Sequence, residues 1–249
     1  MFKCPYHITC QANGSSSHNL LAMPVGLKQK QNVNTIVQKC FQFLQENFTV
    51  ILFHYDGKLD GWWDLKWSKK AVHIVANNQT KWWFAKRFLH PASVSLYDYV
   101  FLWDEDLGVQ HFNPKRFVEG MAPVFSKAAW HCVWHLIQND LVHGWGMDMK
   151  LGYCAQGLRN VGIVDSEYVL HQGIQTLGGP SANKLRHSSS LYNLSFYDLL
   201  LQTSNDVNLA KIRRQSTSEL EIFKRRWEKA VKEDKNWVDP FLRRKQAHK

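Results

Sequence analysis

The chain lacks the apolar segments that a membrane protein or a secreted precursor carries. None of its 249 residues lie in an apolar run approaching the roughly 20 residues of a membrane-spanning helix. The first residues, MFKCPYH, also lack the apolar core of a signal peptide. We therefore expect no membrane segment in this sequence, which as it stands predicts a cytoplasmic protein.

Several nucleotide-binding and metal-binding signatures are missing as well. The sequence has no Gly-x-Gly-x-x-Gly and no Gly-x-x-x-x-Gly-Lys-Ser/Thr, which argues against a Rossmann dinucleotide site and against a P-loop. The five cysteines include no Cys-x-x-Cys pair, so a zinc site is not expected. His131 and His135 lack the glutamate of a His-Glu-x-x-His zinc motif, and we expect both to be solvated.

What the chain does have is an excess of positive charge, concentrated near its C-terminal end. Its net charge is +10, and residues 211–249 hold 13 Lys and Arg against 6 Asp and Glu, a net +7. Such a segment can bind nucleic acid or an acidic partner, or it can be the solvated face of a helix. Because these cations are not interleaved with aromatic residues as in RNA-reading modules, we favour the solvated helix over a nucleic-acid partner.

Apolar periodicity predicts the order β-α-β-β-α-β in the first half of the chain. A helix begins at Asn32, which fits an N-cap, and its apolar residues recur at helical spacing to residue 44. A second helix covers residues 80–89. Four β-branched and aromatic runs predict strands, at residues 19–25, 49–55, 71–76 and 97–103. Strands that alternate with helices favour an α/β fold with a mostly parallel sheet.

In the second half of the chain, the sequence predicts two helices and a strand. Ser126 caps a helix that ends near Gly144, and residues 161–164 form another strand. Residues 218–221 form the capping box of a last helix, whose cations at 224–229 face mainly solvent. We divide the chain into a flexible lead-in, an α/β domain and a basic C-terminal helix and tail, at residues 1–18, 19–210 and 211–249.

Asp104 and Asp106 close the fourth predicted strand, in the run YDYVFLWDED. Because strand residues alternate faces, both acids can point the same way from the strand's carboxyl end, where open α/β sheets hold their ligands. Neighbouring carboxylates repel unless a cation lies between them, and hard oxygen ligands suit Mg²⁺ or Mn²⁺. The pair predicts a divalent-cation site that binds a diphosphate through the metal; the alternative is a solvated acidic turn.

Two further places carry candidate chemistry. Asp148 follows a Trp flanked by glycines, in GWGMD, where the backbone can approach a ligand closely. His171, in VLHQG, follows a short apolar run. Each is weak by itself, since a glycine-flanked Trp is usually a turn anchor and a single His usually has a structural role.

Four segments together resemble a known family: NQTKWWFAKRFLH, WDEDLG, DMKLGYCAQ and VDSEY, at residues 78–90, 103–108, 148–156 and 164–168. They are similar to the plant family called domain of unknown function 707, also labelled lysine-ketoglutarate reductase trans-splicing related. The resemblance covers roughly residues 19–240, and nothing in the sequence supports reductase chemistry. That family in turn is similar to glycosyltransferases of the GT-A fold, in which an Asp-x-Asp at a strand end binds Mn²⁺ and a nucleotide-sugar diphosphate.

The resemblance implies a metal centre and a catalytic base. Asp104 and Asp106 correspond to the metal-binding acids, for Mn²⁺ or Mg²⁺, and His171 resembles the late histidine that completes the metal shell. Asp148 resembles the acid near the acceptor hydroxyl, where it can act as general base.

The resemblance also implies a donor site. Asp56, at the end of the second predicted strand, is placed like residues that contact the nucleoside. Lys81 or Arg87 could neutralise the phosphates, because a departing diphosphate needs cationic stabilisation. The implied partners are a nucleotide-sugar donor of the UDP or GDP type and an unknown acceptor.

The sequence departs from the family pattern after Phe117. There, residues 113–117 run directly into residues 118–126, and a long segment of the family is missing. The N-terminal anchor typical of this family of the Golgi and secretory pathway is missing too. These losses leave three expectations open: a nucleotide-sugar-dependent transferase, a non-catalytic pseudo-enzyme, or a binding module that uses the basic tail.

Overall fold

The computed structural model describes residues 18–44, 47–110, 123–138, 143–155, 169–172, 207–239 and 241. Their centre is a five-stranded sheet in the order β3-β2-β1-β4-β6, in which only β6 runs antiparallel to its neighbour. The strands are β1 (Asn19–Val25), β2 (Phe48–His54), β3 (Val72–Val75), β4 (Tyr99–Leu102) and β6 (Val124–Ser126). The predicted α/β class and mostly parallel sheet are therefore confirmed.

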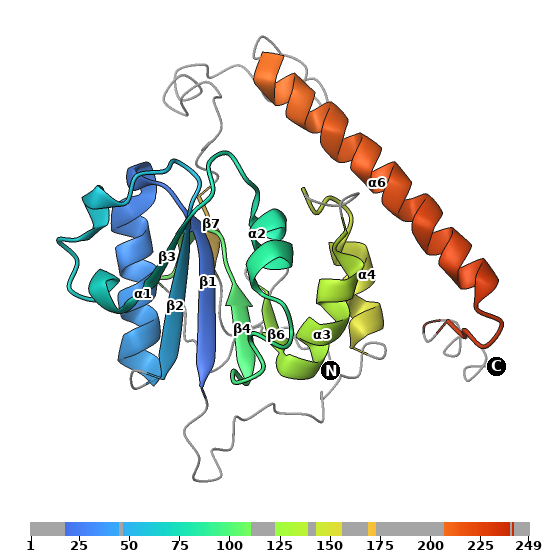
Figure 1. Cartoon of the computed structure of the whole chain (residues 1–249), viewed down its shortest axis with the longest axis horizontal. Coiled ribbons are helices and arrows are strands. Elements are labelled where there is room, and N and C mark those ends of the chain that lie inside the picture. The colour runs from blue at the N-terminus through green and yellow to red at the C-terminus, as the bar shows by residue number, and fades with distance from the viewer. Residues whose placement is uncertain are drawn as a thin grey trace, which may run out of the picture.

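Helices cover both faces of this sheet, which explains the continuous apolar sequence of β1. Figure 1 shows α1 (Lys30–Leu44) on one side and α2 (Lys81–Phe88) and α3 (Lys127–Leu136) on the other. All seven residues of β1 are buried, and Leu20 to Met23 alternate between two apolar clusters. Leu21 and Met23 pack toward the α1 side, whereas Leu20 and Ala22 pack toward α2 and α3. A strand buried on both faces needs no polar alternation.

α1 begins at Lys30, so the prediction that Asn32 is its N-cap is wrong. A short 3-10 turn, η1 (Leu27–Gln29), precedes the helix and places Asn32 inside its first turn. The predicted apolar face is confirmed, since Val33, Ile36 and Val37 are fully buried. The side chain of Asn32 is therefore available for contacts outside its own helix.

Hydroxyl side chains cap α2 and α3, and the cap predicted at Ser126 is confirmed. The Oγ1 of Thr80 accepts from the Trp83 N–H at 3.3 Å, and the Oγ of Ser126 accepts from the Ala129 N–H at 3.3 Å. The predicted end of the second of these helices near Gly144 is wrong. α3 ends at Leu136, and the next residue has an extended backbone (φ −75°, ψ 118°).

The last helix, α6 (Val207–Glu233), runs through the predicted capping box, so residues 218–221 do not start it. Phe223 is buried in the cluster that α2 and α3 form with the sheet, and Leu220 packs against the same cluster. The predicted basic solvent face is partly wrong. Lys224 is exposed, but Arg226 is half-buried and donates to the carbonyl oxygen of Leu136 at 3.0 Å, at the end of α3.

A two-stranded ribbon completes the described structure. β5 (Leu107–Gly108) pairs antiparallel with β7 (Leu170–His171), directly after the acidic turn. None of the helices among the described residues is long and apolar enough to cross a membrane. The predicted strand at 161–164, the lead-in up to residue 17 and the junction at 117–118 lie outside the described residues.

Candidate functional site

The candidate site lies at the carboxyl ends of β2, β1 and β4. The chain passes from β1 through α1 to β2 on one side, and later through α2 to β4 on the other side of β1. The order of the strands therefore reverses at β1, and α1 and α2 lie on opposite faces of the sheet (Figure 1). Open α/β sheets bind ligands at such a switch point, outside the carboxyl ends of the strands.

Three consecutive carboxylates follow β4 at this place. Glu105 is 6% exposed and Asp106 7% exposed. Asp104 is half-buried and forms an ion pair with Lys81, whose Nζ lies 2.7 Å from Oδ2 of Asp104. The turn is therefore not the solvated acidic turn that was the alternative from the sequence.

Glu105, which occupies the variable position of the Asp-x-Asp pattern, is the most enclosed of the three. Burial raises its pKa to about 7, and the charges of Asp104 and Asp106 add to this. The hydroxyl of Tyr55 donates to Oε1 of Glu105 at 2.9 Å and acts in the opposite direction. The ring of Tyr55 also covers Gly26 so closely that a Cβ there would lie 2.6 Å from it.

Asn32 fixes the backbone of the acidic turn from α1. Its Nδ2 donates to the carbonyl oxygens of Glu105 at 2.6 Å and of Leu107 at 3.0 Å. Its Oδ1 accepts from Nε2 of Gln172 at 3.1 Å, and the Gln172 N–H donates to the carbonyl of Asp106 at 3.1 Å. Two segments that are distant in sequence, α1 and the residue after β7, thus hold this turn.

His171 lies next to this turn through its backbone. It pairs with Leu107 across the β5–β7 ribbon, one residue after Asp106. The structure therefore places the backbone of His171 beside the turn. Its side chain lies outside what is described, so a role of His171 in a metal shell stays a prediction.

The carboxylate of Asp56 accepts hydrogen bonds from the backbone at the same edge of the sheet. Its Oδ2 accepts from the Leu27 N–H at 2.8 Å, and its Oδ1 accepts from the Lys58 N–H at 3.1 Å. The carboxylate thus ties the turn after β2 to the start of η1, beside Gly26. A contact with a nucleoside, which the sequence suggested for Asp56, stays a prediction.

The two candidate phosphate-binding cations lie at opposite ends of α2. Lys81 is its first residue and contacts Asp104, whereas Arg87 is exposed in the last turn. Six residues at 1.5 Å each separate them by about 9 Å along the helix axis. Of the two, the structure brings Lys81 to the acidic turn.

Asp148 is the exposed first residue of α4 (Asp148–Cys154). The loop before it reaches α2 through Gly144, which has φ +72° and lies so close to Trp82 that a Cβ would be 2.1 Å from the indole ring. Trp82 follows Lys81 in the chain, and this contact is the connection that the structure shows between the Asp148 loop and the site.

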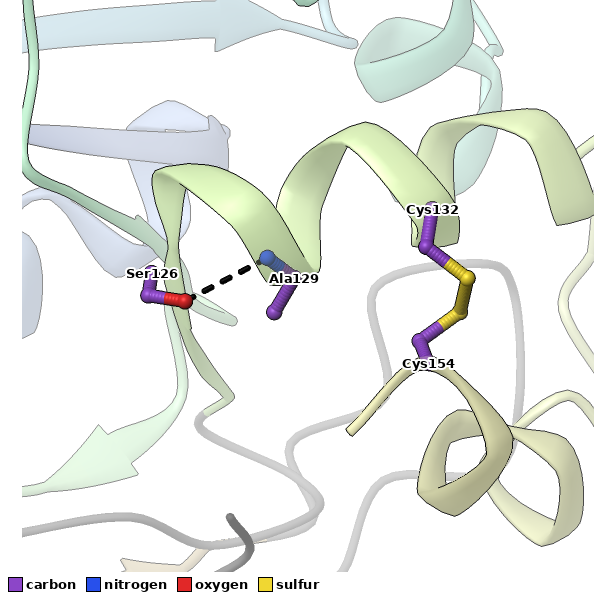
Figure 2. Close-up of a disulfide and its surroundings, with 4 residues drawn as sticks. All are labelled: Ser126, Ala129, Cys132 and Cys154. Carbon is purple, nitrogen blue, oxygen red and sulfur yellow. Dashed lines mark hydrogen bonds between the residues drawn. A yellow bond between two sulfur atoms is a disulfide. The ribbon is translucent and has the colours of Figure 1, made fainter. Parts of the chain in front are cut away.

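A disulfide between Cys132 and Cys154 fixes α4 to α3, with their Cα atoms 5.4 Å apart (Figure 2). It joins the helix that starts at Asp148 to a helix that packs on the sheet. The sequence did not indicate this bond, because the two cysteines are 22 residues apart and match no motif.

Sequence reasoning also missed Glu105, Tyr55 and Asn32. Glu105 falls at the variable position of the motif, and Tyr55 is an ordinary strand-end aromatic residue. The sequence does draw attention to Asn32, but as the N-cap of a helix and not as a residue that contacts the acidic turn. All three gain their role from contacts between elements, which a single sequence does not contain.

The residues at the turn fit a divalent cation chemically. Asp104 and Asp106 supply hard oxygen ligands, and the ammonium of Lys81 shows that the turn takes a cation. No three His, Cys, Asp or Glu side chains gather as a complete ligand set within the described part of the chain. Mg²⁺-type ions are commonly held by one or two carboxylates and completed by substrate phosphates, so such a set is not required.

Comparison with known proteins identifies a family and no function. A family model described as "Protein of unknown function (DUF707)" matches residues 6–119 and 115–233. The two matched segments meet at residues 115–119, where the sequence suggests a missing segment. No curated protein and no solved structure matches the chain.

Proposed function

The chain belongs to the family of proteins of unknown function called DUF707, and we propose that it binds a nucleotide sugar as a metal-dependent protein of the glycosyltransferase type, with a GT-A-like fold. The observation that carries the proposal is the enclosed acidic turn at the switch point, paired with Lys81. A turn of three carboxylates gains most from a cation that also bridges to phosphate.

The donor would lie across the carboxyl edge of the sheet. Asp104 and Asp106 would hold Mn²⁺ or Mg²⁺, with His171 beside them, and the metal would supply charge neutralisation for the departing diphosphate. Asp56 and Tyr55 line the edge next to Gly26, whose lack of a side chain leaves room for the Tyr55 ring.

The acceptor would lie on the side of α4. Asp148 is exposed and can take the proton of an acceptor hydroxyl as general base. Trp145 is 46% exposed between Gly144 and Gly146, both with positive φ. An exposed indole on a tight turn is a suitable platform for a sugar ring.

Calorimetric titration with Mn²⁺ and either UDP or GDP tests the donor site. We expect the double variant Asp104→Asn/Asp106→Asn to lose at least about tenfold in nucleotide affinity, because the bridging cation loses its protein ligands. Asp64→Asn is the matched control, since Asp64 is an exposed acid that pairs with Lys30 outside the turn. If wild type and double variant bind nucleotide equally, the site is wrong.

A pseudo-enzyme is the second candidate, and the break in the family match at residues 115–119 favours it. A pseudo-enzyme would bind metal and nucleotide without transferring or hydrolysing the sugar. Release of UDP or GDP from a panel of nucleotide sugars distinguishes the two. In an enzyme, Asp148→Asn would abolish this release and leave nucleotide affinity unchanged.

The basic tail supports a third and weaker candidate, a nucleic-acid or acidic-partner module. Lys224, Arg225 and Lys229 are exposed on α6. Deleting the helix is a poor test, because Phe223 belongs to the core. Replacing the three cations by Gln leaves the core intact, and RNA affinity that does not change with salt or with this variant would exclude the module.

The disulfide bears on whether the protein resides in an oxidising or a reducing compartment. Cys132–Cys154 is a bond of the kind that persists in the secretory pathway and is rare in the cytosol. We therefore propose an oxidising compartment, in place of the cytoplasmic location expected from the sequence as it stands. Alkylation of free thiols in native tissue extracts, followed by peptide mapping, would find both cysteines blocked if the proposal is correct and both labelled if it is wrong.

A further inference from the structure

Lys81 occupies a position that its own helix disfavours. It is the first residue of α2, whose first turn contains no acidic residue. The N-terminal end of a helix is its positive end, which stabilises anions and repels a lysine. The helix therefore gives no reason for a cation here, and the reason must come from outside it.

Asp104 provides that reason. Nζ of Lys81 lies 2.7 Å from Oδ2 of Asp104, and the two side chains are only 13% and 26% exposed. The contact is a charge-assisted hydrogen bond that is largely shielded from water, so solvent screening weakens it less than an open surface pair. Within the described part of the chain, a cation of the protein itself, Lys81, thus occupies the acidic turn at Asp104.

The ammonium group is held at this place by more than Asp104. It lies 5.5 Å from the centroid of the Trp82 ring, and Trp82 is packed against Gly144. Four methylenes connect it to the backbone of a capped helix, so it can exchange partners by rotation of its side chain while α2 stays in place.

We propose that Lys81 is an internal counter-ion that competes with the divalent cation for Asp104 and moves to the diphosphate when nucleotide binds. This inference rests on the proposed function, because it assumes that Asp104 is a metal ligand. It adds an order to the binding events: metal alone must displace the lysine, whereas metal together with a diphosphate gives the ammonium a new anionic partner.

The competition has a measurable consequence for metal affinity. The wild-type protein should bind Mn²⁺ weakly in the absence of nucleotide, and UDP or GDP should strengthen Mn²⁺ binding. Removing the ammonium should raise the affinity for Mn²⁺ alone by about tenfold, the factor that corresponds to losing one shielded ion pair. It should also weaken nucleotide binding, so that the cooperativity between metal and nucleotide falls.

The decisive experiment measures free Mn²⁺ by electron paramagnetic resonance, with and without UDP or GDP, in wild type, Lys81→Met and Lys81→Arg. Lys81→Met keeps the length of the side chain and removes its charge, whereas Lys81→Arg keeps the charge and should bind Mn²⁺ as weakly as wild type. Arg87→Met is the matched control, because it removes one positive charge from the exposed end of the same helix. Circular dichroism checks that each variant is folded.

The possible results separate this inference from the proposed function. Tighter binding of Mn²⁺ alone in Lys81→Met, and not in Arg87→Met, supports the inference. Equal affinity in wild type and Lys81→Met, with binding still dependent on Asp104 and Asp106, overturns it and leaves the proposed function standing. Absence of Mn²⁺ binding in every variant, with nucleotide present, overturns both.

Discussion

Tyr55 contacts the acidic turn from the end of β2, and the turn follows β4, the strand on the opposite side of β1. Its hydroxyl reaches from the end of β2 to Glu105 after β4, and it is the side-chain donor that the structure shows for this buried carboxyl group. A buried polar group that loses its partner costs more than the bond itself contributes. The contact therefore links the stability of the sheet edge to the geometry of the site.

We expect Tyr55→Phe to lower the free energy of unfolding by about 1–3 kcal/mol, because Glu105 stays buried and loses its donor. Urea denaturation of wild type and variant measures the difference. Tyr153→Phe is the control, since that hydroxyl makes a longer bond of 3.4 Å to Asp239 and should contribute less. Equal losses in the two variants would contradict the role given to Tyr55.

His54, at the end of β2, needs to stay neutral. Nε2 of His73 lies 2.9 Å from the carbonyl oxygen of Ser68, which can only accept, so this nitrogen carries the proton. Nδ1 of His73 must then accept from Nε2 of His54, at 2.8 Å. Nδ1 of His54 is left as a buried acceptor without a partner among the described residues, and protonating it would bury a charge.

The pKa of His54 is accordingly lowered from 6.5 to about 4, by burial first and then by His73, with Asp56 acting in the opposite direction. The unfolded chain takes up a proton at higher pH than the folded one, so stability falls as pH drops from about 6.5 to 4. The loss is up to about 3 kcal/mol at 1.36 kcal/mol per pKa unit. Urea denaturation across this range should show that the free energy of unfolding falls as the pH drops, and that this fall is smaller in His54→Phe. A fall of the same size in His54→Phe would contradict the role given to His54.

At the scale of elements, the predictions from sequence are confirmed where the structure of an element depends only on residues near it in the chain. The apolar faces of α1 and β1 and the cap Ser126 depend on neighbours in sequence, and the structure has them. The errors lie where another element intervenes. α3 ends at Leu136, whose carbonyl oxygen accepts from Arg226 of α6, and residues 218–221 stay helical because α6 packs on the core.

The Cys132–Cys154 bond is the strongest constraint on α4 that the structure shows. It closes a loop of 22 residues, and such a crosslink stabilises by roughly 3 kcal/mol through the entropy of the unfolded chain. We expect Cys132→Ser/Cys154→Ser to lower the melting temperature. The proposed transfer activity should fall in this variant while the proposed nucleotide affinity is kept, because Asp148 begins α4 and the acidic turn lies elsewhere. Cys40→Ser, at the remaining described cysteine, which is free and buried, controls for loss of a thiol. A double variant as stable as wild type would show that the bond does not form.

At the scale of the whole molecule, one motif in the sequence predicts the candidate site, but the sequence does not identify the other residues that surround it. Asp104 and Asp106 were predicted because a strand followed by two acids is a local pattern. That Lys81, and not Arg87, reaches them depends on how α2 lies on the sheet, and that His171 lies beside them depends on a ribbon between residues 64 positions apart. Assignments of this kind need the packing of the chain.

The same packing makes α6 part of the fold instead of a separable tail. Phe223 is 1% exposed in the cluster beneath α2 and α3, and Arg226 binds the end of α3. Replacing Phe223 by Ala should lower the free energy of unfolding by about 3–5 kcal/mol, the range for a buried Phe. We expect Phe223→Ala to lower the urea midpoint of the whole α/β domain in a single transition, whereas Lys224→Ala, at the exposed neighbour, should change stability by less than about 0.5 kcal/mol. If Phe223→Ala melts α6 alone and leaves the sheet at its original stability, the basic helix is an independent unit and the boundary predicted at residue 211 is a true domain boundary.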